Sequence, residues 1–220
     1  MPYRLEDLNY EKDSKERMPW EYYLNLYKDA DPMEIAQRLA IPYDEGSGLF
    51  LLRFYASTYQ ISWPDFTISH VADDMGYYPL EDMIYARILV MRFLLNGVAS
   101  KGSGSYKTYR EMPWGEVYLR QFDGRCIKRL AFSYGNRLED FCRVMEHVGA
   151  RKVSHGDAGY TLEIFDGYEI QMLLWEGDDE FPPSAQFLFS DNFPLSFSAE
   201  DLAQMGDVVI GAMKRFNAVK

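Results

Sequence analysis

Residues 160–175 read Y-T-L-E-I-F-D-G-Y-E-I-Q-M-L-L-W, and this stretch decides the fold. Apolar and polar residues alternate on both sides of Asp166-Gly167, as in two half-buried strands joined by a tight turn. A three-residue loop over 165–167, with its glycine in the left-handed conformation, avoids placing charges opposite apolar residues. This register pairs Ile164 with Tyr168, Leu162 with Ile170 and Tyr160 with Met172. We therefore predict an antiparallel hairpin with one wholly apolar face.

The opposite face of this hairpin is polar at first and apolar at its end. Along the two strands it carries Thr161, Glu163, Glu169, Gln171, Leu173 and Trp175. Because Leu173 and Trp175 would leave an apolar patch on a solvent-facing surface, we expect something to cover them. The cover can be another segment of the chain, a partner or a ligand.

An acidic loop, defined here as residues 175–183 (W-E-G-D-D-E-F-P-P), follows the hairpin directly. It has no basic residue, and its carboxylates are Glu176, Asp178, Asp179 and Glu180. Carboxylates this close repel one another, and a bound cation such as Mg²⁺ or Ca²⁺ would relieve that repulsion. The spacing does not match an EF-hand loop. Two other interpretations therefore stay open: a solvated turn whose carboxylates cap backbone amides, and a docking edge for a protein partner.

Two further groups of residues carry candidate chemistry. His155 and Asp157 could form an acid–base pair, or Asp157 could bond the local backbone in a turn. Arg110 could clamp an anionic group of a ligand, or pair structurally with Glu111 or with the acidic loop. Tyr118 lies in the same aromatic segment as Arg110.

The candidate site combines the acidic loop with both groups. Its residues are Trp175, Glu176, Asp178, Asp179, Glu180, Arg110, Tyr118, His155 and Asp157. We predict a module that binds a small ligand, a cation or a protein partner there. The alternative is an enzyme using carboxylate and histidine acid–base chemistry, or metal-assisted chemistry. The sequence contains no P-loop, G-x-S-x-G, G-x-G-x-x-G or H-E-x-x-H motif, so no catalytic residue, metal ligand or cofactor is assigned.

Patterns elsewhere in the chain predict the remaining elements. Apolar periodicity and capping signals favour helices over 20–29, 32–41, 79–96, 119–134, 136–148 and from 198 onward. Asp31 is expected to cap the second of these, and capping boxes are expected at Asn136-x-x-Glu139 and Ser198-x-x-Asp201. The last helix is expected to bury one apolar face: Leu202, Met205, Val209, Met213 and Phe216. Short β-rich runs favour strands over 49–55, 58–62, 66–70 and 185–189. Strands in two runs, with helices between and after them, predict an α+β fold with a mainly antiparallel sheet packed by several helices.

The domain organisation follows from the same patterns. Residues 1–19 lack a clear period, so we expect a loosely ordered N-terminal lead-in. Residues 20–220 are expected to form a single α+β domain. The Gly/Ser segment 101–105 would allow a sub-division, although a surface loop within one domain is the preferred interpretation.

Composition narrows the classes of partner and cofactor. A net charge of −11 makes nucleic acid an unfavourable partner and favours cations or basic partners. Cys126 and Cys142 lack C-x-x-C spacing, so no iron–sulfur cluster or thiolate zinc site is expected. The longest apolar stretch, 83–98, contains two arginines, and the first 25 residues lack a secretory signal. We therefore expect no membrane span and a cytoplasmic protein of undetermined oligomeric state.

Five segments give the chain a family resemblance. They are I-L-V-M-R-F-L-L-N (88–96), R-E-M-P-W-G-E-V-Y (110–118), G-D-A (156–158), L-W-E-G-D-D-E-F-P-P (174–183) and E-D-L-A-Q-M-G (200–206). In these the chain resembles the "domain of unknown function 3786" family of bacteria and archaea. The resemblance implies a single soluble prokaryotic domain without an assigned activity. Some relatives carry a cysteine-rich iron–sulfur segment, which this sequence lacks, so that association does not transfer.

Overall fold

The computed structural model describes residues 13–218, and their strands form two antiparallel sheets. The first, in the order β1-β2-β3-β4, consists of β1 (Tyr43–Asp44), β2 (Leu49–Phe54), β3 (Ser57–Ser62) and β4 (Ile68–His70). The second, in the order β5-β9-β8-β7-β6, consists of β5 (Tyr106–Thr108), β6 (Arg151–Lys152), β7 (Ala158–Phe165), β8 (Tyr168–Trp175) and β9 (Ser184–Ser190). The predicted α+β class with antiparallel pairing is confirmed.

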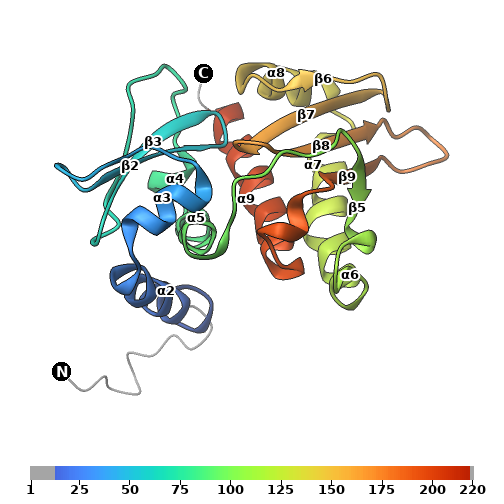
Figure 1. Cartoon of the computed structure of the whole chain (residues 1–220). Coiled ribbons are helices and arrows are strands. Elements are labelled where there is room, and N and C mark those ends of the chain that lie inside the picture. Colours follow the sequence, from blue (N-terminus) through green and yellow to red (C-terminus); the bar gives the residue numbers. More distant parts are fainter. Residues whose placement is uncertain (1–12, 219–220) are drawn as a thin grey trace, which may run out of the picture.

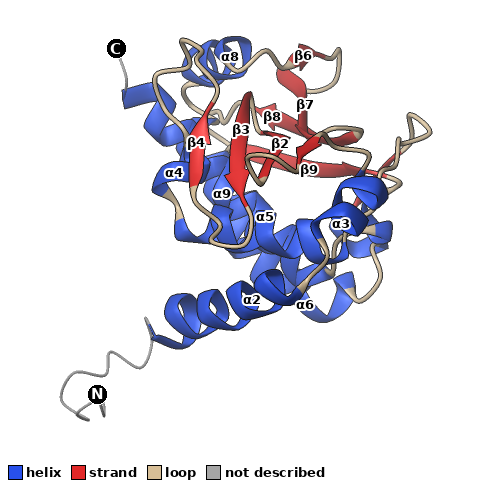
Figure 2. Cartoon of the chain, turned by 60° about the vertical axis from the view of Figure 1, so that its left-hand side comes forward, coloured by secondary structure: helices blue, strands red, loops and turns tan. Residues whose placement is uncertain are grey.

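The helices pack beside these sheets. They are α2 (Met18–Asp29), α3 (Pro32–Leu39), α4 (Pro79–Asp82), α5 (Ile84–Asn96), α6 (Gly115–Phe122), α7 (Arg129–Tyr134), α8 (Leu138–His147) and α9 (Ala199–Ala218). Short helical turns are η2 (Asp13–Arg17), η3 (Tyr109–Glu111), η4 (Asp123–Lys128) and η5 (Phe193–Leu195). Both overall views place α5 between the first sheet and α2 (Figures 1 and 2).

The chain is already helical from Asp13, because the π-helical turn η2 leads directly into α2. Residues 13–19 of the expected lead-in are therefore helical, and residues 1–12 lie outside the described part. Tyr27 fixes α2 on the first sheet, since its side chain is fully buried and its hydroxyl donates to the Ser62 carbonyl (3.2 Å).

The hairpin of β7 and β8 has the predicted register along most of its length. Tyr160 faces Met172 and Leu162 faces Ile170, as expected. The predicted pairing of Ile164 with Tyr168 is wrong, because Phe165 faces Tyr168 and Ile164 lies in a β-bulge. The predicted three-residue loop over 165–167 is wrong for the same reason, since only Asp166 and Gly167 lie between the strands. The bulge has a tertiary cause: the Ile164 carbonyl accepts a hydrogen bond from the Tyr55 amide of the β2–β3 turn (2.8 Å).

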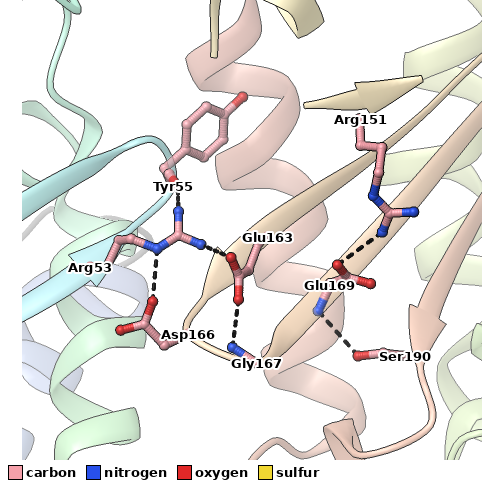
Figure 3. A network of polar contacts seen from close by, with 8 residues as sticks. All are labelled: Arg53, Tyr55, Arg151, Glu163, Asp166, Gly167, Glu169 and Ser190. Atoms are coloured by element: carbon pink, nitrogen blue, oxygen red, sulfur yellow. Dashed lines mark hydrogen bonds and ion pairs between the residues drawn. The ribbon is translucent and has the colours of Figure 1, made fainter. Parts of the chain in front are cut away.

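Two carboxylates face each other across this hairpin, Glu163 on β7 and Glu169 on β8. Like charges in such a position destabilise a sheet unless each finds a counter-ion. Figure 3 shows that each does: Arg53 of β2 binds Glu163 and also Asp166 (2.7 Å), and Arg151 of β6 binds Glu169 (3.1 Å). The Arg53 contacts join the two sheets at the hairpin turn.

The segment expected as one helix over 79–96 is two helices. Met83 adopts an extended conformation between α4 and α5. Arg87 supports the break, because its guanidinium donates to the carbonyls of Leu80 (3.0 Å) and Glu81, which the break removes from the regular helical pattern. These contacts of Arg87 within its own segment leave no signal in the apolar periodicity.

Helix starts were predicted with mixed success. Asp31 caps α3 through the Met33 amide (2.8 Å), as expected. The helix expected from residue 119 begins earlier, at Gly115. The capping box expected at Asn136 is wrong: Arg137 precedes α8, and its side chain makes no capping bond.

One continuous core of buried side chains spans both sheets, so the described residues form a single domain. Cys126 is buried in this core, Cys142 is partly buried, and both are free thiols. The 101–105 segment separates the strands of the first sheet from those of the second along the chain. Within residues 13–218, every helix is too short or too polar to cross a membrane.

The capping box that starts α9 is confirmed. Asp201 Oδ2 accepts from the Ser198 amide (2.8 Å), and Ser198 Oγ accepts from the Asp201 amide (3.2 Å). The apolar face predicted for this helix is buried, and it consists of Leu202, Met205, Val209, Met213 and Phe216.

Replacing Ser198 with alanine should lower the free energy of unfolding by about 1 kcal/mol, because the first turn of α9 loses its side-chain acceptor. Urea denaturation checks this. Ser133→Ala, inside α7, is the matched control and should not destabilise the protein. Equal urea midpoints for Ser198→Ala and wild type would contradict the role of the Ser198 side chain as the cap of α9.

Candidate functional site

The acidic loop connects β8 to β9, and Trp175 faces Ser184 where the two strands stop pairing. Asp178 organises the loop from within: its Oδ1 accepts from the amides of Glu180 (2.8 Å) and Phe181 (2.7 Å). These two bonds lower the pKa of the Asp178 carboxyl group. In this geometry the Asp178 carboxylate serves as a cap for its own turn.

Asp157 is brought to the base of the same loop. Its Oδ2 accepts from the Glu176 amide (2.8 Å), and its own amide donates to the Leu174 carbonyl (2.9 Å). Gly156, with a φ of +75°, allows this turn to lie close to β8, because a Cβ at this position would be only 2.7 Å from the Leu174 oxygen. His155 is exposed. Asp157 therefore ties its turn to the loop through the backbone.

The expected cover over the end of the sheet comes partly from the chain itself. Leu173 is buried, and a Cβ built on Gly159 would lie 2.9 Å from both Leu173 and Val153. The side chains of Val153 and Leu173 therefore both lie beside Gly159. Trp175 remains 36% exposed.

The turn between α7 and α8 packs against the acidic loop, which the sequence did not indicate. A Cβ on Gly135 would come within 2.2 Å of the Pro183 side chain, so only glycine fits this approach. On the loop side, a Cβ on Gly177 would lie 2.7 Å from the Pro183 nitrogen. The loop is held both by its own hydrogen bonds and by this contact.

Within residues 13–218, neither Arg110 nor Tyr118 forms a hydrogen bond or an ion pair with the acidic loop. Arg110 pairs with Glu116 (3.6 Å), and both side chains are exposed. The structural pairing expected with Glu111 or the loop is therefore replaced by one with Glu116. Glu111 instead accepts from the amide and hydroxyl of Thr108 (both 2.8 Å). Tyr118 is exposed on α6.

A metal site at the acidic loop stays a prediction. Among the described residues, no group of three or more His, Cys, Asp or Glu side chains is arranged to hold a metal ion. The carboxylates of Glu176, Asp179 and Glu180 have no hydrogen-bond or ion-pair partner within residues 13–218.

A different part of the molecule holds a pocket of about 610 Å³, here called the interhelical pocket. It lies among η2, α2, α5, η4 and α9, and two of these five, η2 and η4, are π-helical turns, which often occur at functional sites. The lining residues are Ser14, Lys15, Pro19, Tyr23, Tyr85, Ile88, Arg92, Arg125, Glu200, Gln204 and Asp207.

Arg92 and Asp201 form the best-fixed polar contact of this region. The guanidinium meets the carboxylate through two atom pairs, Nε–Oδ1 at 2.9 Å and Nη2–Oδ2 at 3.2 Å. Asp201 is only 4% exposed and also accepts from the Ser198 amide. Arg92 further lies over the Tyr23 ring, 5.2 Å from its centroid. The Nη2–Oδ2 pair is a hydrogen bond and the Nε–Oδ1 pair an ion-pair contact, and together they hold Arg92 at the pocket wall.

A second ion-paired group lies toward the other end of the pocket. Asp207 accepts from Arg125 Nε (2.8 Å) and from Arg129 Nη1 (3.1 Å). Two guanidinium groups share one carboxylate, and half of the Arg125 side chain is exposed. Gln204 donates to the Tyr85 carbonyl (3.2 Å), which joins α9 to α5 across the pocket. Burial raises the pKa of both Tyr23 and Tyr85.

The structure contains another sizeable pocket, of about 740 Å³, beside α8 and the end of α9. Its polar groups bond mainly to one another: Arg143 donates to Asp140 (2.6 Å) and Asn217, and His147 contacts the Met75 carbonyl (3.0 Å). We favour the interhelical pocket as the candidate site because charged side chains from four elements converge on it and two of its elements are π-helical turns.

None of the lining residues of the interhelical pocket was a predicted site residue. Two signals in the sequence pointed toward it. Arg92 is one of two arginines in a mainly apolar helix, and such a residue needs a partner when buried. The capping box at Ser198 and Asp201 marks where α9 begins. Nothing in the sequence connects the two signals, because Arg92 and Asp201 are 109 positions apart.

The comparison with protein families identifies the chain. The model of the domain of unknown function 3786 (DUF3786) matches residues 31–212, and the protein belongs to this family. The predicted resemblance is confirmed. No curated protein and no solved structure matches the chain. Arg92, Arg125 and Glu200 lie within the matched range, whereas Lys15 and Tyr23 precede it.

Replacing Asp178 with alanine should speed amide hydrogen exchange at Glu180 and Phe181, because both amides lose their acceptor. Asp179→Ala, one position away, is the control and should leave that exchange unchanged. Exchange mass spectrometry or NMR checks both variants.

The same contacts predict a pH dependence. The pKa of Asp178 is lowered in the folded state, so the protection it gives is complete above the ordinary aspartate pKa. It should be lost as the pH falls through the lowered value. Protection factors for these amides that do not change across the acid range would contradict the cap.

Proposed function

We propose that the protein is a small-ligand-binding module whose ligand occupies the interhelical pocket. One observation carries the proposal: the pocket wall is built from charged side chains already fixed by their own partners, Arg92 by Asp201 and Arg125 by Asp207. Side chains held in place lose little conformational entropy when a ligand binds, which favours affinity.

The size and composition of the pocket support the proposal. Its volume of about 610 Å³ is within the range of small-molecule sites, roughly 300–1,000 Å³. Tyr23, Tyr85 and Ile88 supply apolar surface, and the charged groups converge from several helices. Seven of the eleven lining residues are polar or charged, so the pocket suits a small polar ligand.

Binding is preferred over catalysis because of what the candidate catalytic groups do. Asp157 and Asp178 use their carboxylates to hold backbone amides, and His155 is exposed. The enzyme alternative therefore gains no support from the geometry. Cation binding by the acidic loop and a cytoplasmic location, both expected from the sequence, remain part of the proposal.

Thermal melting of the full chain with a library of small polar metabolites tests this function. A ligand present at 100 times its Kd stabilises the folded state by about 2.7 kcal/mol. For a chain of this size that corresponds to a rise in Tm of roughly 5–10 °C. Gln204→Trp places a large side chain on the pocket wall and should abolish the rise.

The matched control is Gln121→Trp, which adds the same side chain at an exposed position of α6. It should keep the full rise in Tm. A ligand that stabilises the Gln204→Trp variant as much as wild type would contradict binding in this pocket, as would a library without a stabilising compound.

A further inference from the structure

The charges around the interhelical pocket are unevenly distributed between its two ends. The Tyr23 hydroxyl lies in the field of Arg92, Asp201 and Glu200. Arg92 is neutralised by its two-point contact with Asp201, which leaves the Glu200 carboxylate as the excess charge. This end of the pocket, here called the Glu200 end, carries one negative charge in excess.

Glu200 is exposed in the first turn of α9 and has no hydrogen-bond or ion-pair partner within residues 13–218. It differs in this respect from the pocket's other carboxylate, since Asp207 accepts from two arginines. The Glu200 carboxylate is therefore available to a ligand cation, with the Tyr23 ring beside it.

The opposite end, here called the Arg125 end, has the reverse balance. The Tyr85 hydroxyl lies in the field of Glu16, Lys15 and Arg125. The Tyr85 hydroxyl donates to Glu16 (3.3 Å). Arg125 and Arg129 share the single carboxylate of Asp207, so these three groups together carry one positive charge in excess.

Arg125 can also offer hydrogen bonds at this end. Its Nε and Nη2 atoms contact Asp207, and its Nη1 group is not used in these bonds. Half of its side chain is exposed, and Arg125 is one of the residues that line the pocket. Guanidinium groups with unused donors are well suited to bind carboxylates.

From this separation of charge we propose that the ligand is a small zwitterion, an amino acid or a short peptide with free termini. Its ammonium group binds at Glu200 and its carboxylate at Arg125. The inference rests on the proposed function, because it assigns a ligand class to the same pocket. A purely anionic ligand would meet Glu200 and a purely cationic one would meet Arg125, so either would be opposed at one end.

Isothermal titration calorimetry on the full chain tests the ligand class. The probes are the twenty natural amino acids and tripeptides Ala-X-Ala with each natural residue at X. The tightest binder is then compared with its N-acetylated form, which lacks the ammonium, and its C-terminal amide, which lacks the carboxylate. Each capped form should bind at least tenfold more weakly.

Two variants assign the ends. In Glu200→Gln, acetylation of the ligand should no longer weaken binding, whereas amidation should still do so. In Arg125→Gln, amidation should no longer weaken binding, whereas acetylation should still do so. The controls are Glu139→Gln, an exposed glutamate in the first turn of α8, and Arg120→Gln, an exposed arginine of α6. In both controls, acetylation and amidation should each still weaken binding. Thermal melts establish that every variant is folded.

The outcomes separate the two proposals. Capped and free forms that bind equally overturn the zwitterion inference. If no amino acid or tripeptide binds, but another compound stabilises wild type and not Gln204→Trp, the ligand class is wrong and the pocket function stands. If no compound of either kind binds, both the zwitterion inference and the proposed pocket function are wrong. Comparison of single amino acids with tripeptides shows which of the two zwitterions the pocket prefers.

Discussion

The contact between Arg92 and Asp201 is the interaction on which most of the structure depends. It joins α5, the central helix under the first sheet, to the start of α9, the helix with the longest buried face in the described chain. Removing one partner of a buried ion pair leaves the other charge unpaired and costs roughly 3–5 kcal/mol. The same contact holds Arg92 against Tyr23 and fixes one wall of the interhelical pocket.

The second constraint is the junction of the two sheets. The hairpin turn of β7 and β8 docks against the β2–β3 turn through the Ile164 bulge and the Arg53 contacts (Figure 3). This junction compensates for a pair of facing glutamates and accounts for the bulge that shifts the register near the turn. The sheets supply the rigid part of the fold, and the candidate site lies among the helices.

Local patterns predicted the elements well, because periodicity and capping act over a few neighbouring residues. Strands β2, β3, β7, β8 and β9, the α3 cap and the capping box of α9 belong to this class, whereas the short strands β1 and β5 were not predicted. The Ile164 bulge could not be predicted, because it contacts the β2–β3 turn, which is distant in sequence. The break at Met83 could not be predicted either, because the Arg87 contacts that support it leave no signal in the apolar periodicity. The acidic loop was predicted as the candidate site only because of its four carboxylates. Its most informative carboxylate, Asp178, proved to be engaged by its own backbone, whereas the pocket residues are scattered over five segments.

The measurement that tests the account most directly is a double-mutant cycle between Arg92→Met and Asp201→Asn, read by urea denaturation. Because the two side chains contact each other and are largely buried, the predicted coupling energy is about 1–3 kcal/mol. The double variant should then lose clearly less stability than the two single losses combined. Losses that add to within about 0.5 kcal/mol would show that the contact does not organise α5, α9 and the pocket between them.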